Sequence, residues 1–169
     1  IGRSRGVDPY DAAFDLLIEE GEEMGSLLWS SKAFREDDII MCLQQPECAV
    51  ISDTTALAPY GALKNNIGSI SGYGWAARFF QDYVNDKKIL TLTEAIRRIS
   101  SLPAERLGLI KRGQLKKTFY ADICVFDPQK IKNNCDLKNL KTYPSGIEHV
   151  LVNGIFAVKH GNRTEFDGG

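Results

Sequence analysis

The chain has 169 residues, of which 43% are hydrophobic and 25% are charged. This is the composition of an ordinary globular protein, long enough for one domain with a core or for one domain and an appended unit. The formal net charge of -1 gives no electrostatic reason to expect a nucleic acid or an anionic membrane as a partner. We also find no apolar run of membrane-spanning length and no N-terminal signal pattern.

Two further features of the sequence bear on its context. The four cysteines form no CxxC pair, which disfavours a zinc knuckle or a redox motif and favours a reducing, cytoplasmic location. The chain begins at Ile1 without a methionine and runs directly into a predicted helix. We therefore expect a piece of a longer polypeptide.

The first third of the chain predicts two helices and two strands. Asp8-Pro9 opens a helix with an apolar stripe, and a glycine at 21 or 25 ends it. A short strand is expected at 26–30, and a second helix from about Arg35 to Gln44. The apolar run 49–51 then predicts a buried strand. Alternation of helices and strands is typical of parallel sheets.

The middle of the chain predicts a long loop followed by helices. Four glycines punctuate the segment 56–74, and a loop of this length in a compact domain is usually functional or disordered. A helix is expected over 75–84, and another begins at Thr91, where Thr91 and Glu94 form a capping-box pattern. Arg97 and Arg98 suit the negative end of that helix, and a short helix over 104–107 follows.

Beyond residue 108 the hydrophobic pattern changes to a period of two, which indicates strands. One strand is predicted over 120–127. Two more, 147–152 and 155–158, flank Asn153-Gly154, a strong signal for a hairpin because both turn residues require positive φ. The polar segment 130–143 is expected to be a surface loop.

Asp53 is the main candidate for chemistry. It follows the predicted strand 49–51 and is surrounded by the hydroxyls of Ser52, Thr54 and Thr55, which could hydrogen-bond its carboxylate and keep it ionised. A carboxylate at the carboxyl end of a barrel strand could act as a general base, as a metal ligand, or as both. The alternative is that Asp53 only caps a turn.

Other candidate residues give weaker signals. Tyr73 and Trp75 could line an apolar substrate pocket, or Trp75 could simply anchor the next helix in the core. The chain has only two histidines, His149 in a predicted strand and His160 in a predicted turn. Without a supporting cluster, these two residues do not predict a zinc site.

Four motifs in this order resemble the C-terminal part of one family, the N-acyl-D-amino-acid deacylases (D-aminoacylases) of the amidohydrolase superfamily. They are 51–59 (ISDTTALAP), 90–108 (LTLTEAIRRISSLPAERLG), 120–128 (YADICVFDP) and 146–154 (GIEHVLVNG). The likeness also includes the opening helix 8–17 (DPYDAAFDLL) and so covers nearly the whole chain.

The resemblance implies an α/β fold: the C-terminal portion of a zinc-dependent (β/α)8 barrel, followed by strands of a small β-sandwich domain. Residues 1–108 would be the last βα units of the barrel with trailing helices, and residues 109–169 the C-terminal part of the β-domain. Asp53 would be the catalytic aspartate after the last barrel strand and a potential contact of the metal. The substrate would be a small N-acyl-D-amino acid, cleaved to a carboxylate and a D-amino acid.

The chain departs from the family pattern in lacking its His-x-His strand and its further zinc ligands. We therefore expect that this piece alone does not bind zinc tightly and is inactive. Because a few βα units cannot close a barrel, we also expect it to fold by self-association or by rearranging its strands. Two other hypotheses stay open: a cyclic amidohydrolase of the dihydropyrimidinase or hydantoinase type, and a non-catalytic interaction module.

Overall fold

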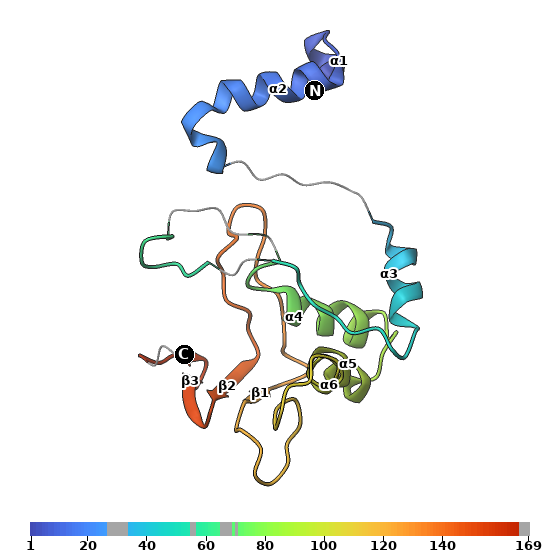
Figure 1. The fold of residues 1–169 in the computed structure, drawn as a ribbon, viewed down its shortest axis with the longest axis vertical. Helices are drawn as coiled ribbons and strands as arrows, with labels where there is room; N and C mark the ends of the chain where they lie inside the picture. Colours follow the sequence, from blue (N-terminus) through green and yellow to red (C-terminus); the bar gives the residue numbers. More distant parts are fainter. Residues whose placement is uncertain (27–33, 55–56, 65–68, 70, 166–169) are drawn as a thin grey trace.

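The computed structural model describes residues 1–26, 34–54, 57–64, 69 and 71–165 (Figure 1). The helical elements are α1 (Gly2–Arg5), α2 (Pro9–Glu20), the 3-10 helix η1 (Gly21–Ser26), α3 (Glu36–Leu43), α4 (Trp75–Phe79), the π-helix η2 (Phe80–Asp86), α5 (Leu92–Ile99) and α6 (Ser101–Arg106). The strands are β1 (Ile123–Phe126), β2 (Ile147–Val152), β3 (Ile155–Lys159) and β4 (Asn162–Arg163).

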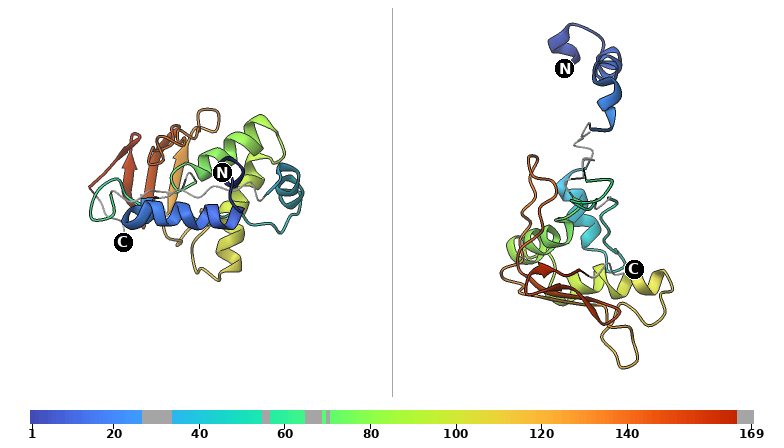
Figure 2. Two further views of the ribbon diagram at one scale, coloured as in Figure 1. Left: turned by 90° about the horizontal axis from the view of Figure 1, so that it is seen from above. Right: turned by 90° about the vertical axis from the view of Figure 1, so that its left-hand side faces the viewer.

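Helices α1 and α2 form an N-terminal arm that stands apart from the other elements (Figures 1 and 2). The predicted start of α2 is confirmed, because the Asp8 carboxylate accepts a hydrogen bond from the Tyr10 N–H at 2.8 Å and Pro9 is the first helical residue. The predicted apolar stripe, however, faces solvent. The exposed fractions of Tyr10, Phe14 and Ile18 are 78%, 63% and 77%.

The predicted helix at 35–44 is confirmed as α3, but the predicted buried strand at 49–51 is wrong. These three residues have no strand partner among the described residues, and Ile51 is 76% exposed. A parallel strand is stable only between neighbours that satisfy its backbone groups. Here the Val50 N–H instead donates to the Arg98 carbonyl on α5 at 3.0 Å. The other predicted strand, at 26–30, lies almost wholly outside the described residues.

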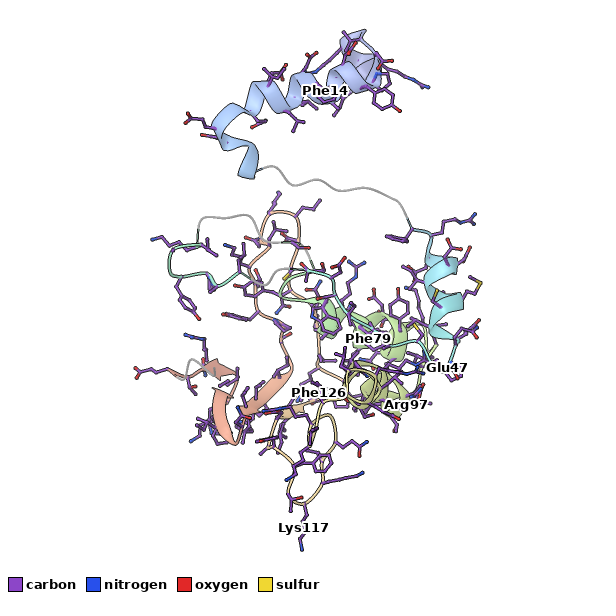
Figure 3. All side chains as sticks on the ribbon, viewed as in Figure 1. Phe14, Glu47, Phe79, Arg97, Lys117 and Phe126 are labelled. Atoms are coloured by element: carbon purple, nitrogen blue, oxygen red, sulfur yellow. The ribbon has the colours of Figure 1, made fainter. Side chains whose placement is uncertain are left out.

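The core lies where the central helices meet the start of the sheet. Its buried members come from α3, α4, η2, α5 and the segment after β1: Leu43, Ala77, Phe79, Phe80, Ala95 and Ile131. The ring of Phe80 lies 5.2 Å from that of Phe126 on β1. Figure 3 labels Phe126 together with Phe79, the residue before Phe80. The predicted helix 75–84 is confirmed as α4 and the π-helix η2 that continues it. The core draws on residues both before and after 108, while the predicted division at that residue stays a prediction.

The sheet is antiparallel, with strand order β1-β2-β3-β4. The predicted hairpin is confirmed: Asn153 (φ 51°) and Gly154 (φ 84°) connect β2 to β3. Before β2, Gly146 (φ 85°) lies so close to the segment after β1 that a Cβ atom there would be 2.5 Å from the backbone of Lys130 and Ile131. Within the described ranges we find neither a parallel pair nor a second sheet. No described helix has the length and apolar character needed to span a bilayer.

Candidate functional site

The backbone that leads to Asp53 is held by a buried arginine of α5. Arg98 is only 3% exposed, and its Nη1 donates to the carbonyl oxygens of Gln45 at 2.5 Å and Cys48 at 3.2 Å. Its Nε donates to the carboxylate of Glu94 at 2.8 Å. These bonds hold the segment that precedes the predicted strand against α5.

Glu94 organises this group of side chains. Hydrogen bonds from Arg97, together with those from Arg98, lower the pKa of Glu94 to about 2. Arg97 also donates to the carbonyl of Pro46. Of the predicted capping box, the bond to the threonine is confirmed: Thr91 Oγ1 accepts from the Glu94 N–H at 3.2 Å. The Glu94 carboxylate binds Arg97 and Arg98 instead of completing the box. Sequence reasoning assigned these arginines to the end of the helix and missed their role as anchors.

Asp53 itself is exposed and takes the left-handed backbone conformation (φ 43°) that aspartate tolerates better than most residues. In the described part of the chain its carboxylate has no hydrogen-bond or ion-pair partner. The prediction that Ser52 and Thr54 hold the carboxylate is therefore wrong, and Thr55 lies outside the described residues. Thr54 Oγ1 is buried and has no partner among these residues. A buried hydroxyl without a partner is unfavourable.

Tyr73 and Trp75 lie at the end of the long loop. The Tyr73 hydroxyl donates to the Leu57 carbonyl, and its ring lies 5.1 Å from that of Tyr143. Burial raises the pKa of Tyr73. Trp75 is the first residue of α4 and is partly buried. No described hydrogen bond or ring contact joins either residue to Asp53, so their substrate-binding role stays a prediction. The Tyr73 hydroxyl instead connects the end of the loop to Leu57 near its beginning.

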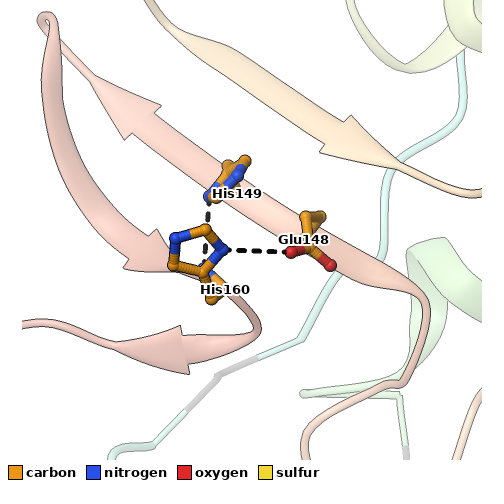
Figure 4. A group of neighbouring side chains, drawn as sticks. All are labelled: Glu148, His149 and His160. Carbon is orange, nitrogen blue, oxygen red and sulfur yellow. Dashed lines mark hydrogen bonds and ion pairs between the residues drawn. The ribbon is translucent and has the colours of Figure 1, made fainter.

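The two histidines meet at the far end of the β2–β3 hairpin (Figure 4). His149 Nδ1 accepts from the His160 N–H at 3.2 Å, and the ring centroids are 4.8 Å apart. His160 Nδ1 lies 3.3 Å from Glu148 Oε1. Sequence reasoning treated each histidine alone; the signal that it overlooked is the hairpin register, which pairs His149 with Lys159, the neighbour of His160.

A hydrolytic metal centre does not fit the residues around Asp53 in this chain. Catalytic zinc sites use about three protein ligands. Among the described residues, the group that could offer three such ligands is Glu148, His149 and His160, and it does not include Asp53. The described residues therefore supply no set of metal ligands that includes Asp53.

Comparison with known proteins connects this geometry to a family. No family model matches the chain. The N-acyl-D-glutamate deacylase of Alcaligenes xylosoxydans xylosoxydans is 37% identical over 82 residues, which are 48% of this chain and 17% of the relative. A crystal structure of a D-aminoacylase, an amidohydrolase, superposes with a TM-score of 0.70 and 25% identity over 80% of this chain and 27% of that one.

The chain resembles part of a D-aminoacylase. A second solved structure agrees: the N-acyl-D-glutamate deacylase from Bordetella bronchiseptica, complexed with zinc and a phosphonate mimic of the tetrahedral intermediate, superposes with a TM-score of 0.65 and 28% identity over 80% of this chain and 28% of that one. The family resemblance predicted from the motifs is thus confirmed. In both solved structures the matched part is little more than a quarter of the D-aminoacylase-like chain.

Proposed function

We propose that this chain is part of a zinc-dependent amidohydrolase that cleaves the linear amide of N-acyl-D-amino acids. The observation that carries the proposal is the 37% identity to a deacylase that acts on N-acyl-D-glutamate. In this proposal residues 1–108 belong to the end of a (β/α)8 barrel and residues 109–169 to a small β-domain. The superposition on D-aminoacylase supports that assignment.

Asp53 is the residue that we propose as the general acid and base. Its carboxylate accepts a proton from water while the water oxygen attacks the amide carbonyl carbon. Asp53 then gives this proton to the amide nitrogen as the C–N bond breaks, leaving a carboxylate and a free D-amino acid. Two features support this role: the exposed carboxylate and the backbone segment anchored by Arg98.

The test is the replacement Asp53→Asn in the full-length enzyme that contains this chain. Asparagine tolerates the left-handed conformation at this position, so folding should be preserved. Because general acid–base catalysis is lost, we expect kcat for an N-acyl-D-amino acid to fall by roughly 10²–10⁴-fold. The matched control is Asp86→Asn, which removes an exposed carboxylate at the end of η2 and should leave kcat unchanged.

Two results would contradict the proposal. An unchanged kcat in Asp53→Asn would remove Asp53 from the reaction. Efficient hydrolysis of a cyclic amide such as a hydantoin, without activity on linear N-acyl-D-amino acids, would place the enzyme in another amidohydrolase class. The isolated chain should show no turnover in either assay, because the described residues form no complete metal centre around Asp53.

A further inference from the structure

The two histidines of the chain and one glutamate share the end of the hairpin, although neighbouring strand residues normally point to opposite faces. Glu148 and His149 are adjacent on β2, and His160 reaches both because it occupies the turn after β3 with a left-handed backbone (φ 50°). The turn is fixed to β2 by a hydrogen bond from the Gly161 N–H to the Glu148 carbonyl at 2.9 Å. The convergence is therefore built into the register of the hairpin.

We propose that Glu148, His149 and His160 bind a divalent transition-metal ion of the kind that prefers imidazole, such as Ni²⁺, Zn²⁺ or Cu²⁺. Two imidazole nitrogens with one carboxylate oxygen suit these ions better than Ca²⁺ or Mg²⁺, which prefer oxygen ligands alone. The proposal does not depend on the proposed function, because none of the three residues takes part in the role assigned to Asp53.

The distances are compatible with such an ion after small movements of side-chain ends. Bonds of about 2.0–2.1 Å to a metal place two ligand atoms roughly 3.0–3.4 Å apart. His160 Nδ1 and Glu148 Oε1 are 3.3 Å apart, and the ligand atoms of all three residues lie within 4.8 Å of one another. The side chains of His160 and Glu148 are 69% and 58% exposed, so they can move without disturbing the core.

His149 provides the more rigid side of the site. Its ring packs edge-on against Phe156 at 5.5 Å between centroids. Because Nδ1 accepts the His160 N–H, the lone pair of that nitrogen faces the turn that carries His160. A metal ion bound through His149 Nδ1 replaces this one hydrogen bond, and the remaining coordination positions stay open to water. We therefore expect an exposed site of moderate affinity.

The histidines allow a specific experiment, because the chain contains only these two. Total metal uptake would not identify the site, since the chain also has four free cysteines. We therefore choose Ni²⁺ titration of the 169-residue chain followed by proton NMR, because every imidazole signal then comes from the proposed site. Paramagnetic Ni²⁺ should broaden the signals of His149 and His160 together, with one shared dissociation constant in the micromolar range.

Three variants test the geometry. His160→Asn keeps a residue that tolerates the left-handed turn and should weaken Ni²⁺ binding, read at His149, by about tenfold or more. Glu148→Gln should weaken it by a smaller factor, and Glu105→Gln, an exposed control on α6, should leave it unchanged. Broadening of one histidine without the other, or equal affinity in His160→Asn and the unmodified chain, would overturn the proposal. So would binding only at millimolar Ni²⁺.

Discussion

The carboxylate of Glu94 receives hydrogen bonds from two guanidinium groups, those of Arg97 and Arg98. One of its partners, Arg98, is also bonded to the backbone before Asp53. The ionised form of Glu94 therefore contributes to the position of the candidate catalytic segment. The sequence predicted Glu94 only as part of a helix cap, whereas in the structure it supports the contact between α5 and the segment before Asp53.

This arrangement predicts a specific pH dependence of stability. The pKa of Glu94 is about 2 in the folded chain, against 4.5 ordinarily, so the folded state binds the proton less readily than the unfolded state. The contribution of Glu94 to the free energy of unfolding is thus fully present above about pH 4.5 and is lost as the pH falls toward 2. Urea unfolding at several pH values across this window should show a falling midpoint.

Glu94→Gln provides the comparison for this measurement. Its unfolding midpoint should fall less steeply between pH 4.5 and 2 than that of the unmodified chain. A residual slope is expected, because hydrogen bonds also lower the pKa values of Glu36, Asp122, Asp127 and Asp136. Parallel curves for the two proteins would show that the ionisation of Glu94 does not contribute to the stability of the fold.

Among single residues, the sequence predicted those whose role is local. The Asp8 and Thr91 caps act within one helical turn, and both are present. The anchoring by Arg98 could not be predicted in the same way, because it depends on a partner brought near by the tertiary fold. The pairing of the histidines follows from the register of the predicted hairpin, and sequence reasoning overlooked it.

At the scale of elements, the hairpin was predictable because its determinants are local, whereas the predicted strand at 49–51 depended on distant neighbours. The Asn153-Gly154 turn determines the hairpin through its own backbone preferences, and β2 and β3 then pair directly. The run 49–51 has the right composition for a strand, but a strand also requires neighbours. In the described part of the chain α5 takes that place, through the Arg98 carbonyl and side chain.

Two glycines, one directly before β2 and one directly before β3, allow a test of how closely the sheet packs. Both Gly146 and Gly154 have positive φ, so alanine is strained at either position. At Gly154 a Cβ atom meets only the Ala121 side chain at 3.9 Å, whereas at Gly146 it would lie 2.5 Å from the backbone of Lys130 and Ile131. Gly154→Ala should therefore lower the free energy of unfolding by about 1 kcal/mol, and Gly146→Ala by about 2–3 kcal/mol.

Urea denaturation of the two variants checks this difference. The Gly154→Ala protein serves as the control for backbone strain without a steric clash. Equal losses in both proteins would mean that the segment before β2 does not pack as closely on residues 130 and 131 as the structure shows.

For the whole molecule, the notable feature is the apolar surface of the N-terminal arm. Tyr10, Phe14 and Ile18 are largely exposed on α2, which stands apart from the core (Figure 2). A contiguous apolar face of this kind is unfavourable in water. In the proposed full-length enzyme other polypeptide would cover it, but for the chain alone a second copy is the available partner.

We therefore expect the 169-residue chain to self-associate at micromolar concentration. Analytical ultracentrifugation should show a weight-average mass that rises with concentration. Replacing Phe14 and Ile18 together by glutamate should shift the distribution toward the monomer. Association would then bury the new carboxylates on the α2 face of each copy, which is unfavourable. Glu20→Lys, an exposed change near the end of the same helix, is the control; a monomeric unmodified chain would contradict the prediction.

The likeness to D-aminoacylase was predictable from the ordered motifs rather than from periodicity. The helix and strand pattern alone suggested parallel pairing that the described residues do not contain. The reason is physical: a parallel strand is stabilised by its neighbours in the sheet. The matched region is 27% of the D-aminoacylase chain on which it superposes.

The bonds from Arg98 to the carbonyls before Asp53 also constrain the order in which the chain can fold during synthesis. They join residues that are 53 and 50 positions apart, so the earlier segment cannot be placed until the later one exists. During synthesis the segment before Asp53 emerges from the ribosome before α5 does, so these bonds can form only after α5 has been added. In this protein the candidate catalytic aspartate is synthesised before the arginine that anchors its segment.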